Sequence, residues 1–403
     1  MSPSKTILCI ASYEKGHEFL RQCKREGWRV ILLTSKSLQE KAQWPTESID
    51  EVFYIPDVKK QWNMNDVILG VSYMARTEQI DRIVALDDYD VEKAASLREH
   101  LRLQGTGETG ARYFRDKLAM RRAAAAAGIA VPNFVHILNY KRIQDFLDAV
   151  APPWVLKPRL QAGAIGIKKI EDADQLWKMI EGLGDEQSFY VLEQYVPGNV
   201  HHVDSILYDG QVLLATAHEY AIPPMEVAHQ GRVFSTHTMI RGTEAEQALQ
   251  KINRDLLNTV GLKQGVSHTE FIKGSEDGKF YFLETSARVG GAHIVELVEA
   301  STGLNLWAEW AKIETLLEGE KYELPPHRSD YGGLMVSLAK QEWPDLSAYD
   351  APEVSWKLKK KNHAGIIVCS PDYDRVTQLL GEYTQRFYKD FFASAPPKQE
   401  PGD

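Results

Sequence analysis

The sequence predicts an α/β fold, because short apolar runs alternate with helix-like stretches along its first hundred residues. Thr6–Ala11 and Arg29–Thr34 have the apolar character of strands, and Gly16–Glu26 between them has the pattern of a helix. Ile83–Leu86 is a further strand, followed by a helix over Val91–Leu101. Strands that alternate with helices predict a parallel sheet. The 403 residues suffice for two or three packed units, and a composition of 43% hydrophobic and 26% charged residues is ordinary for a soluble globular protein.

Charge and cysteine content exclude several classes of protein. The formal net charge of -9 argues against a general nucleic-acid binder, which usually carries a basic stripe. The three cysteines, Cys9, Cys23 and Cys369, lack metal-ligand spacing and indicate free thiols in a reducing compartment. No apolar run approaches the roughly 20 residues of a membrane span. We therefore expect a cytoplasmic protein that binds neither nucleic acid nor membrane, with a homodimer as one option for its oligomeric state.

The turns of this first α/β unit suggest where a ligand lies. The turn Ala11–Gly16 lacks the three spaced glycines of a dinucleotide fingerprint, so a nicotinamide cofactor is not expected. Asp87, Asp88 and Asp90 follow the strand Ile83–Leu86. Acids in that position either face a ligand crevice or cap the next helix, and the sequence favours neither interpretation.

A β-hairpin near residue 275 carries the most informative polar pattern. Gly265–Phe271 and the run that starts at Phe280 have strand character, and Gly274–Lys279 between them has turn chemistry. In the simplest register Glu270 faces Glu284. Directly opposed side chains have Cβ atoms roughly 4.5–5.5 Å apart, so two like charges there need a cation between them. Mg²⁺, usually held by one or two carboxylates and substrate phosphates, fits best.

The same register predicts which other side chains share the face of the two glutamates. His268 falls opposite Ser286, and the period of two continues from Ser286 to Arg288, an anion-binding group. Ile272 and Phe282 are expected on this face too, as the floor of a cleft. The alternative is a solvated sheet face that happens to carry two acids.

The hairpin pattern resembles the signature of ATP-grasp enzymes: a glutamate, then Glu284-x-Ser286-x-Arg288 followed by Gly290 and Gly291. In that family two acids and usually an asparagine hold Mg-ATP, and the arginine serves an acyl phosphate. Serine stands here where asparagine is commoner. The resemblance implies the metal ligands Glu270, Glu284 and Ser286, and the catalytic residues Arg288, Glu284 and His268.

Two lysines upstream extend the resemblance to the nucleotide. Lys117 lies in an Arg-Asp-Lys sequence that opens an alanine-rich helical run from Tyr113 to Gly128, which on composition alone is a surface helix. Lys157 ends the strand Trp154–Pro158 and precedes the loop Gln161–Gly166, whose glycines allow backbone N–H groups to approach phosphate, although a plain hairpin turn needs the same residues. In the family the first lysine reaches ATP and the loop is a mobile phosphate loop.

The linker after Phe189–Glu193 corresponds in the family to the adenine contact. Asp204 alternates with His202 on one strand face and is expected beside the ribose or phosphates. A zinc site is the alternative for these residues, but the histidines show no familiar zinc spacing. The resemblance implies a nucleotide-binding set of Lys117, Lys157, Gln161, Gly163, Gly166, Glu193, Gln194, Val196 and Asp204.

The resemblance covers about residues 110–310 and implies an ATP-grasp fold. It consists of an N-terminal Rossmann-like pre-ATP domain, a two-lobed nucleotide-binding region and a small C-terminal α+β lobe. The expected limits are 1–112 for the pre-ATP-grasp domain, 113–200 for the small lobe or lid, 201–320 for the large lobe with the metal and catalytic hairpin, 321–393 for the C-terminal lobe and 394–403 for a disordered tail.

Within the superfamily the chain looks most like the carboxylate-amine ligases, which include amino-acid and dipeptide ligases. Such an enzyme uses ATP and Mg²⁺ to activate a small-molecule carboxylate as an acyl phosphate, which an amine then displaces to leave an amide, ADP and phosphate. One alternative is a carboxylase or purine-pathway enzyme that uses bicarbonate or formate. The other is a nucleotide-binding regulatory module without turnover, for which Ser286 is the best support.

Overall fold

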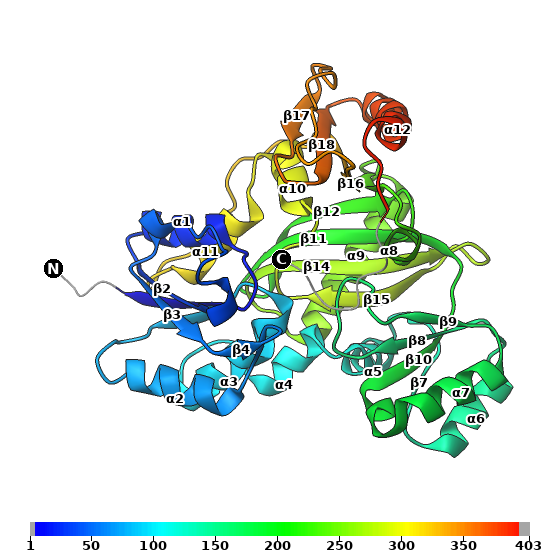
Figure 1. Cartoon of the computed structure of the whole chain (residues 1–403), viewed down its shortest axis with the longest axis horizontal. Coiled ribbons are helices and arrows are strands. Elements are labelled where there is room, and N and C mark those ends of the chain that lie inside the picture. The colour runs from blue at the N-terminus through cyan, green and yellow to red at the C-terminus, as the bar shows by residue number, and fades with distance from the viewer. Residues whose placement is uncertain (1–4, 395–403) are drawn as a thin grey trace.

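The structure is a computed structural model that describes residues 5–394. Its strands form a parallel four-stranded sheet, an antiparallel four-stranded sheet, an antiparallel eight-stranded sheet and a two-stranded ribbon, β4 (Asp57–Val58) with β5 (Gln61–Trp62). Figure 1 shows the parallel sheet (blue) and the smaller antiparallel sheet (green, β7 to β10) beside the large central sheet. The predicted tail lies outside the described residues except for Ser394.

The first unit is the predicted parallel sheet, in the strand order β3-β2-β1-β6. Alternate residues of β1 point to opposite faces, so Ile7 packs toward α1 and Leu8 toward α2 and α3. Both faces are therefore covered, as the continuous apolar strands require. The elements are β1 (Thr6–Ala11), α1 (His17–Arg25), β2 (Arg29–Ser35), β3 (Glu51–Ile55), α2 (Met64–Met74), β6 (Arg82–Ala85) and α3 (Val91–Leu101).

The second unit is a small antiparallel sheet in the order β7-β10-β8-β9, with two helices on one face. Leu156 and Leu192 are paired across β8 and β10 and point into the core under these helices. Lys157 and Glu193, one position further along each strand, therefore point to the other face. The elements are β7 (Phe134–His136), α6 (Tyr140–Ala149), β8 (Trp154–Pro158), β9 (Lys168–Ile170), α7 (Ala173–Leu183) and β10 (Tyr190–Gln194).

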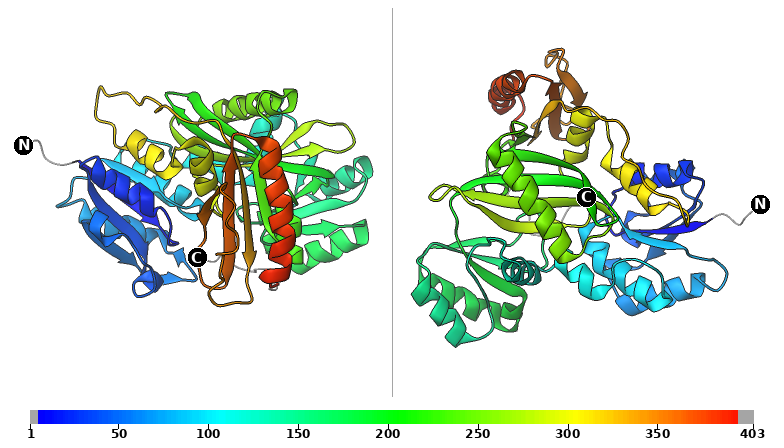
Figure 2. Two further views of the ribbon diagram at one scale, coloured as in Figure 1. Left: turned by 90° about the horizontal axis from the view of Figure 1, so that it is seen from above. Right: turned by 180° about the vertical axis from the view of Figure 1, so that it is seen from behind.

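The central sheet has the order β15-β14-β11-β12-β13-β16-β18-β17. Val203 of β11 packs under α5 and α9, so its neighbours His202 and Asp204 point to the opposite face. The elements are β11 (Gly198–Tyr208), β12 (Gln211–Tyr220), β13 (Phe234–Thr238), α9 (Glu244–Val260), β14 (Gly265–Gly274), β15 (Phe280–Ser286), β16 (Tyr331–Leu338), β17 (Val354–Lys357) and β18 (His363–Ser370). Figure 2 shows α9 lying across this sheet.

The strands of the C-terminal segment, predicted as a small lobe over 321–393, extend the central sheet. Phe234–His237 of β13 pair with Gly333–Val336 of β16, and β18 and β17 follow. This pairing satisfies the backbone of β13, which would otherwise be an open edge. Helix α12 (Tyr373–Asp390) lies along these strands, as Figure 2 also shows. The predicted domain limits remain predictions.

Helices α10 (Ile294–Thr302) and α11 (Leu306–Glu314) join the first unit to the central sheet. Phe19 of α1 packs edge-on against Trp310 of α11, with ring centroids 5.0 Å apart, and the Trp28 indole donates to the Thr315 carbonyl at 3.0 Å. This packing brings the carboxyl end of β6 against the hairpin. Two short helices complete the fold, α4 (Glu108–Ala111) and α8 (Pro224–Gln230).

The alanine-rich helix α5 (Lys117–Ala126) begins later than Tyr113, where the sequence predicts its start. The side chain of Asp116 accepts from the Leu118 and Ala119 amides and so caps the helix. Lys117 is therefore the first residue of α5, directly after the capping residue. In residues 5–394, none of the helices combines the length and apolarity that crossing a membrane demands.

Candidate active site

The hairpin of β14 and β15 has the predicted register at its acidic end. Glu270 pairs with Glu284, and His268 pairs with Ser286. All four side chains are held on β14 and β15, at one edge of the eight-stranded sheet, rather than on a loop. The spacing argument therefore placed the two carboxylates correctly from the sequence.

A β-bulge corrects the prediction that Phe282 shares the glutamate face. The register shifts between Glu270 and Phe271, so Phe271 pairs with Phe282 and Leu283 is the extra residue. Phe282 consequently points into the core under α9, whereas Ile272 stays with the apolar side chains around Tyr220. Because of the bulge, Phe282 and Glu284 point to opposite faces of the sheet although they are only two residues apart.

A lysine supplies the cation that Glu284 needs. Lys117 Nζ lies 2.7 Å from Glu284 Oε2 and donates to the Gln161 carbonyl at 2.6 Å. Burial raises the pKa of Glu284, but Lys117 outweighs it and leaves the pKa below its usual value. Arg159 in turn fixes Asp116, the cap before Lys117, through Nε at 2.9 Å. Lys117 is thus positioned by the capped N-terminus of its own helix.

The partners of Glu270 differ from those of Glu284. The Tyr220 hydroxyl donates to Glu270 Oε1 at 2.9 Å, and His268 Nε2 lies 3.6 Å from the same oxygen. Burial lowers the pKa of His268, but the carboxylate of Asp204, helped by Glu270, raises it to about 10. His268 is therefore an imidazolium at neutral pH, next to the glutamate pair.

Asp204 lies in a buried group of histidines, and its predicted role beside the ribose or phosphates remains a prediction. Its side chain is fully buried, and its two oxygens lie 2.9 Å from His268 Nδ1 and 2.7 Å from His202 Nδ1. Burial raises the pKa of Asp204, but the two histidines hold it well below its usual range. Asp204 is a buried anion that fixes the ring of His268.

Arg288 pairs with the first unit. Its Nε donates to Asp88 Oδ2 at 2.8 Å, and Nη2 donates to the same oxygen. Burial favours the neutral form of both groups, but the ion pair keeps the pKa of Asp88 below and that of Arg288 above the usual value. The carboxyl end of β6 therefore meets the end of the hairpin.

The acids Asp87, Asp88 and Asp90 have different partners, and only the helix-cap interpretation is observed directly. Asp87 Oδ1 accepts from the Tyr89 amide at 3.0 Å, which is a helix cap. Asp90 Oδ2 accepts from the Ser12 amide at 2.7 Å. Asp88 alone turns toward the hairpin.

The second lysine stands in a buried network of charges. Lys157 Nζ lies 2.7 Å from Glu193 Oε2, and Arg121 Nε lies 3.0 Å from Glu193 Oε1. Burial lowers the pKa of Lys157 to about 8, although Glu193 opposes this. The sequence argument missed Arg121, although its spacing of four from Lys117 on a helix puts both cations on one face.

The network also involves residues of the predicted adenine contact. The carboxylate of Glu193 is held by two cations. The Gln194 N–H donates to the Asn133 carbonyl at 2.8 Å, because β10 extends through Gln194. The adenine contacts of Glu193, Gln194 and Val196 remain predictions.

The loop after β8 lies against the pair of Lys117 and Glu284. Gly163 and Gly166 have φ angles of 68° and 74°, which favour glycine. The loop is anchored at Gln161, whose side chain accepts from the Tyr89 hydroxyl at 3.2 Å. A small cavity remains beneath it, lined by Asp88, Phe114, Arg115, Lys117, Met120, Gln161, Ala162, Glu284, Thr285 and Ser286.

Comparison with known proteins identifies the fold. Residues 150–296 match the model of the ATP-grasp domain. These residues are therefore similar to an ATP-grasp domain. It is 21% identical over 264 residues to an L-arginine-specific L-amino acid ligase of Bacillus subtilis, which covers 64% of this chain and 62% of the relative. It is 20% identical over 286 residues to the alanine–anticapsin ligase of Bacillus subtilis strain 168, covering 64% and 59%. The chain thus spans about three-fifths of these relatives.

Solved structures with the ATP-grasp fold superpose on nearly the whole chain. The L-amino acid ligase from Bacillus licheniformis has a TM-score of 0.76 at 16% identity and covers 99% of this chain and 100% of its own. An N5-carboxyaminoimidazole synthetase from Staphylococcus aureus complexed with ADP has a TM-score of 0.72 at 13% identity, covering 94% and 97%. The predicted ATP-grasp fold is confirmed.

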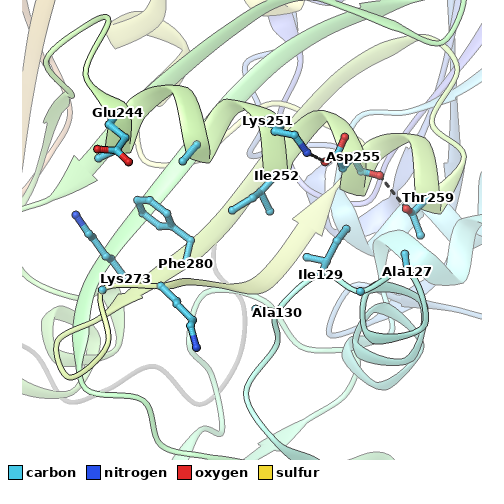
Figure 3. A pocket seen from close by; sticks show the side chains of 15 residues that line it. Ala127, Ile129, Ala130, Glu244, Lys251, Ile252, Asp255, Thr259, Lys273 and Phe280 are labelled. Atoms are coloured by element: carbon cyan, nitrogen blue, oxygen red, sulfur yellow. Dashed lines mark hydrogen bonds and ion pairs between the residues drawn. The ribbon is translucent and has the colours of Figure 1, made fainter.

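A groove with none of these groups in its walls lies elsewhere on the central sheet. Figure 3 shows it between α9, the end of α5 and the hairpin turn, with a volume of about 780 Å³. Its walls include Lys251, Asp255, Lys273 and Phe280 and none of the predicted site residues. The charged cluster around Glu270 and Glu284 is the candidate active site.

Proposed function

We propose that the chain is an ATP-dependent carboxylate-amine ligase. Three observations support this: the opposed pair Glu270 and Glu284, the cation Lys117 beside them, and the likeness to L-amino acid ligases. In the proposed reaction a carboxylate oxygen of the substrate attacks the terminal phosphorus of ATP, and ADP leaves. The amine nitrogen of the second substrate then attacks the acyl carbon, phosphate leaves, and the nitrogen loses a proton. The glutamate pair is the observation that carries the proposal.

The donor set fits Mg²⁺. Glu270, Glu284 and Ser286 offer oxygen atoms on adjacent strands, the ligand type that this hard cation prefers. Lys117 already lies beside Glu284, so this position of the structure favours a positive charge. Bound Mg²⁺ would supply neutralisation of the phosphate charge. We propose these three residues as its protein ligands.

Lys117 and Lys157 are proposed to bind the phosphates. Phosphoryl transfer depends on positioning and charge neutralisation more than on covalent chemistry by the protein. Both lysine side chains are buried beside carboxylates, Lys117 at Glu284 and Lys157 at Glu193. The loop Gln161–Gly166 is proposed to close over them and exclude water, so that the acyl phosphate reacts with the amine.

Arg288 is proposed to orient the substrate carboxylate and to stabilise the oxyanion that forms when the amine attacks. A guanidinium donates two parallel hydrogen bonds to such a group, which an ammonium cannot reproduce. His268, held as an imidazolium beside Glu270, adds a second positive charge near the same centre. The amine and carboxylate are small molecules, and the homodimer and cytoplasmic location remain predictions.

The test is ATP-dependent phosphate release over a matrix of amino acids and other carboxylates with amines, followed by mass spectrometry. We expect ADP, phosphate and an amide in equal amounts, and only when acid and amine are both present. ADP formation that follows bicarbonate or formate instead would replace the proposal with a carboxylase. Tight ATP binding without turnover across the matrix would replace it with a regulatory module.

A further inference from the structure

A second cluster of ligand-type side chains lies in the middle of the central sheet. His202 and Asp204 are two residues apart on β11, so they share a face, and His218 on β12 is the direct partner of His202. All three side chains are fully buried. Their donor atoms lie within 4.8 Å of one another. Among residues 5–394, whose side chains are described except at 228–230, this group alone brings three such residues so close.

The contacts within the cluster leave one side chain unsatisfied. Asp204 Oδ2 lies 2.7 Å from His202 Nδ1 and 3.6 Å from His218 Nδ1. Within the described part of the chain, neither ring nitrogen of His218 has a hydrogen-bond partner. Buried polar groups normally have partners, because an unpaired one loses its hydration without replacement. A ligand that accepts the lone pair of His218 would remove this cost.

The spacing of the donor atoms suits a tetrahedral metal ion. Zinc lies about 2.0–2.1 Å from nitrogen and oxygen ligands, so two ligands of one ion are about 3.3 Å apart. The 2.7 and 3.6 Å separations around Asp204 bracket this value. Imidazole and carboxylate together suit Zn²⁺ better than Mg²⁺. Binding requires the His218 ring to rotate out of its stack on His202, where the centroids are 4.6 Å apart.

The surroundings of His202 are those of a metal ligand. Its Nε2 lies 2.9 Å from the Thr236 hydroxyl, which donates its own hydrogen to the Glu219 carbonyl at 3.0 Å. Nε2 of His202 therefore donates to Thr236. Nδ1 lies 2.7 Å from Asp204 Oδ2, a contact that needs a proton, and a metal bound at Nδ1 would displace that proton. A partner such as Thr236 orients a metal-bound histidine and favours one tautomer.

We infer that His202, Asp204 and His218 form a Zn²⁺ site, distinct from the oxygen-ligand site of Glu270 and Glu284. The ion joins β11 to β12. It also holds Asp204, whose other oxygen holds His268 in the active site. The ligands come from paired strands, so their spacing along the sequence does not resemble that of familiar zinc sites.

The test is the zinc content of the full-length protein, expressed with added zinc and separated from free metal by gel filtration. We expect one zinc per chain in the natural protein and in Glu284→Gln, which alters only the other site. His218→Asn and His202→Asn should retain less than a tenth of this. His201→Asn is the matched control, because His201 is the next residue of β11, points to the opposite face and packs on Phe280.

Cobalt substitution gives a second measurement on the natural protein, so the inference stays testable if a variant fails to fold. A tetrahedral site predicts intense visible absorption bands, and His201→Asn should keep them. Thr236→Val should weaken zinc binding by about 10–100-fold, as loss of an outer partner commonly does. Zinc that gel filtration removes from the natural protein is an adventitious ion only and overturns the inference. Zinc retained by folded His218→Asn, or weak bands typical of octahedral cobalt, also overturns it.

Discussion

Replacing Arg288 separates a catalytic role from a structural one, because this residue has both a proposed substrate contact and a buried ion pair. Arg288→Ala removes a donor to the reacting oxyanion, which commonly costs about 10²–10³ in rate. It also leaves Asp88 buried without its cation, and breaking a buried pair costs roughly 3–5 kcal/mol of stability. The single variant should therefore lose both amide formation and stability.

The double variant Asp88→Asn with Arg288→Ala distinguishes the two effects. Removing the unpaired carboxylate should restore most of the unfolding free energy, measured by denaturant titration. The rate of amide formation should stay about 10²–10³ below that of Asp88→Asn alone. If the double variant regained the rate of Asp88→Asn together with its stability, Arg288 would be a structural residue and the reasoning would be refuted.

The pairing also predicts a pH dependence of stability. The pKa of Asp88 is lowered in the folded state, so its contribution is present above its unfolded pKa and is lost as pH falls through the folded value. In Arg288→Ala the carboxyl of Asp88 lacks the main cation that lowers its pKa, so the part of the acid-induced loss of stability that Asp88 causes should be smaller. The test is to measure the unfolding midpoint of the natural protein and of the variant as the pH is lowered. An identical dependence on pH in the two proteins would count against the ion pair.

Three further predictions address the nucleotide site. Glu284→Gln should abolish magnesium-dependent ATP binding and turnover, whereas Glu276→Gln in the exposed turn of the same hairpin should not; calorimetry with and without magnesium decides this. With a pKa of about 8, the fraction of Lys157 that is protonated falls from about nine-tenths at pH 7 to about one-tenth at pH 9. The affinity for ATP should therefore fall over that range, and Lys157→Arg should remove this pH dependence. Hydrogen exchange in Gln161–Gly166 should slow when Mg-ATP is added, and equal exchange would rule out a phosphate lid.

The sequence predicted what short-range patterns control. The parallel first unit follows from alternating apolar and helical segments, and the pairing of Glu270 with Glu284 follows from two strands joined by a short turn. Helix α9 over Glu244–Val260 is likewise defined locally, by its amphipathic pattern and the following Gly261. In each case the relevant residues are close in the chain.

Long-range contacts account for what the sequence did not reveal. One inserted residue at Leu283 moves Phe282 to the other face, and nothing near it marks the bulge. Asp88 meets Arg288, and Glu193 meets Arg121, only because separate units pack together. His218 joins His202 and Asp204 through strand pairing, and β16 joins β13 where a lobe boundary was expected.

The measurement that tests the central claim most directly is the fate of isotope in the substrate carboxylate. With both carboxylate oxygens labelled with ¹⁸O, an acyl phosphate route transfers one labelled oxygen to inorganic phosphate for each amide formed, and mass spectrometry of the phosphate detects it. We predict one label in phosphate and none in ADP. Unlabelled phosphate, or label that appears in AMP, would contradict the proposed ligase mechanism.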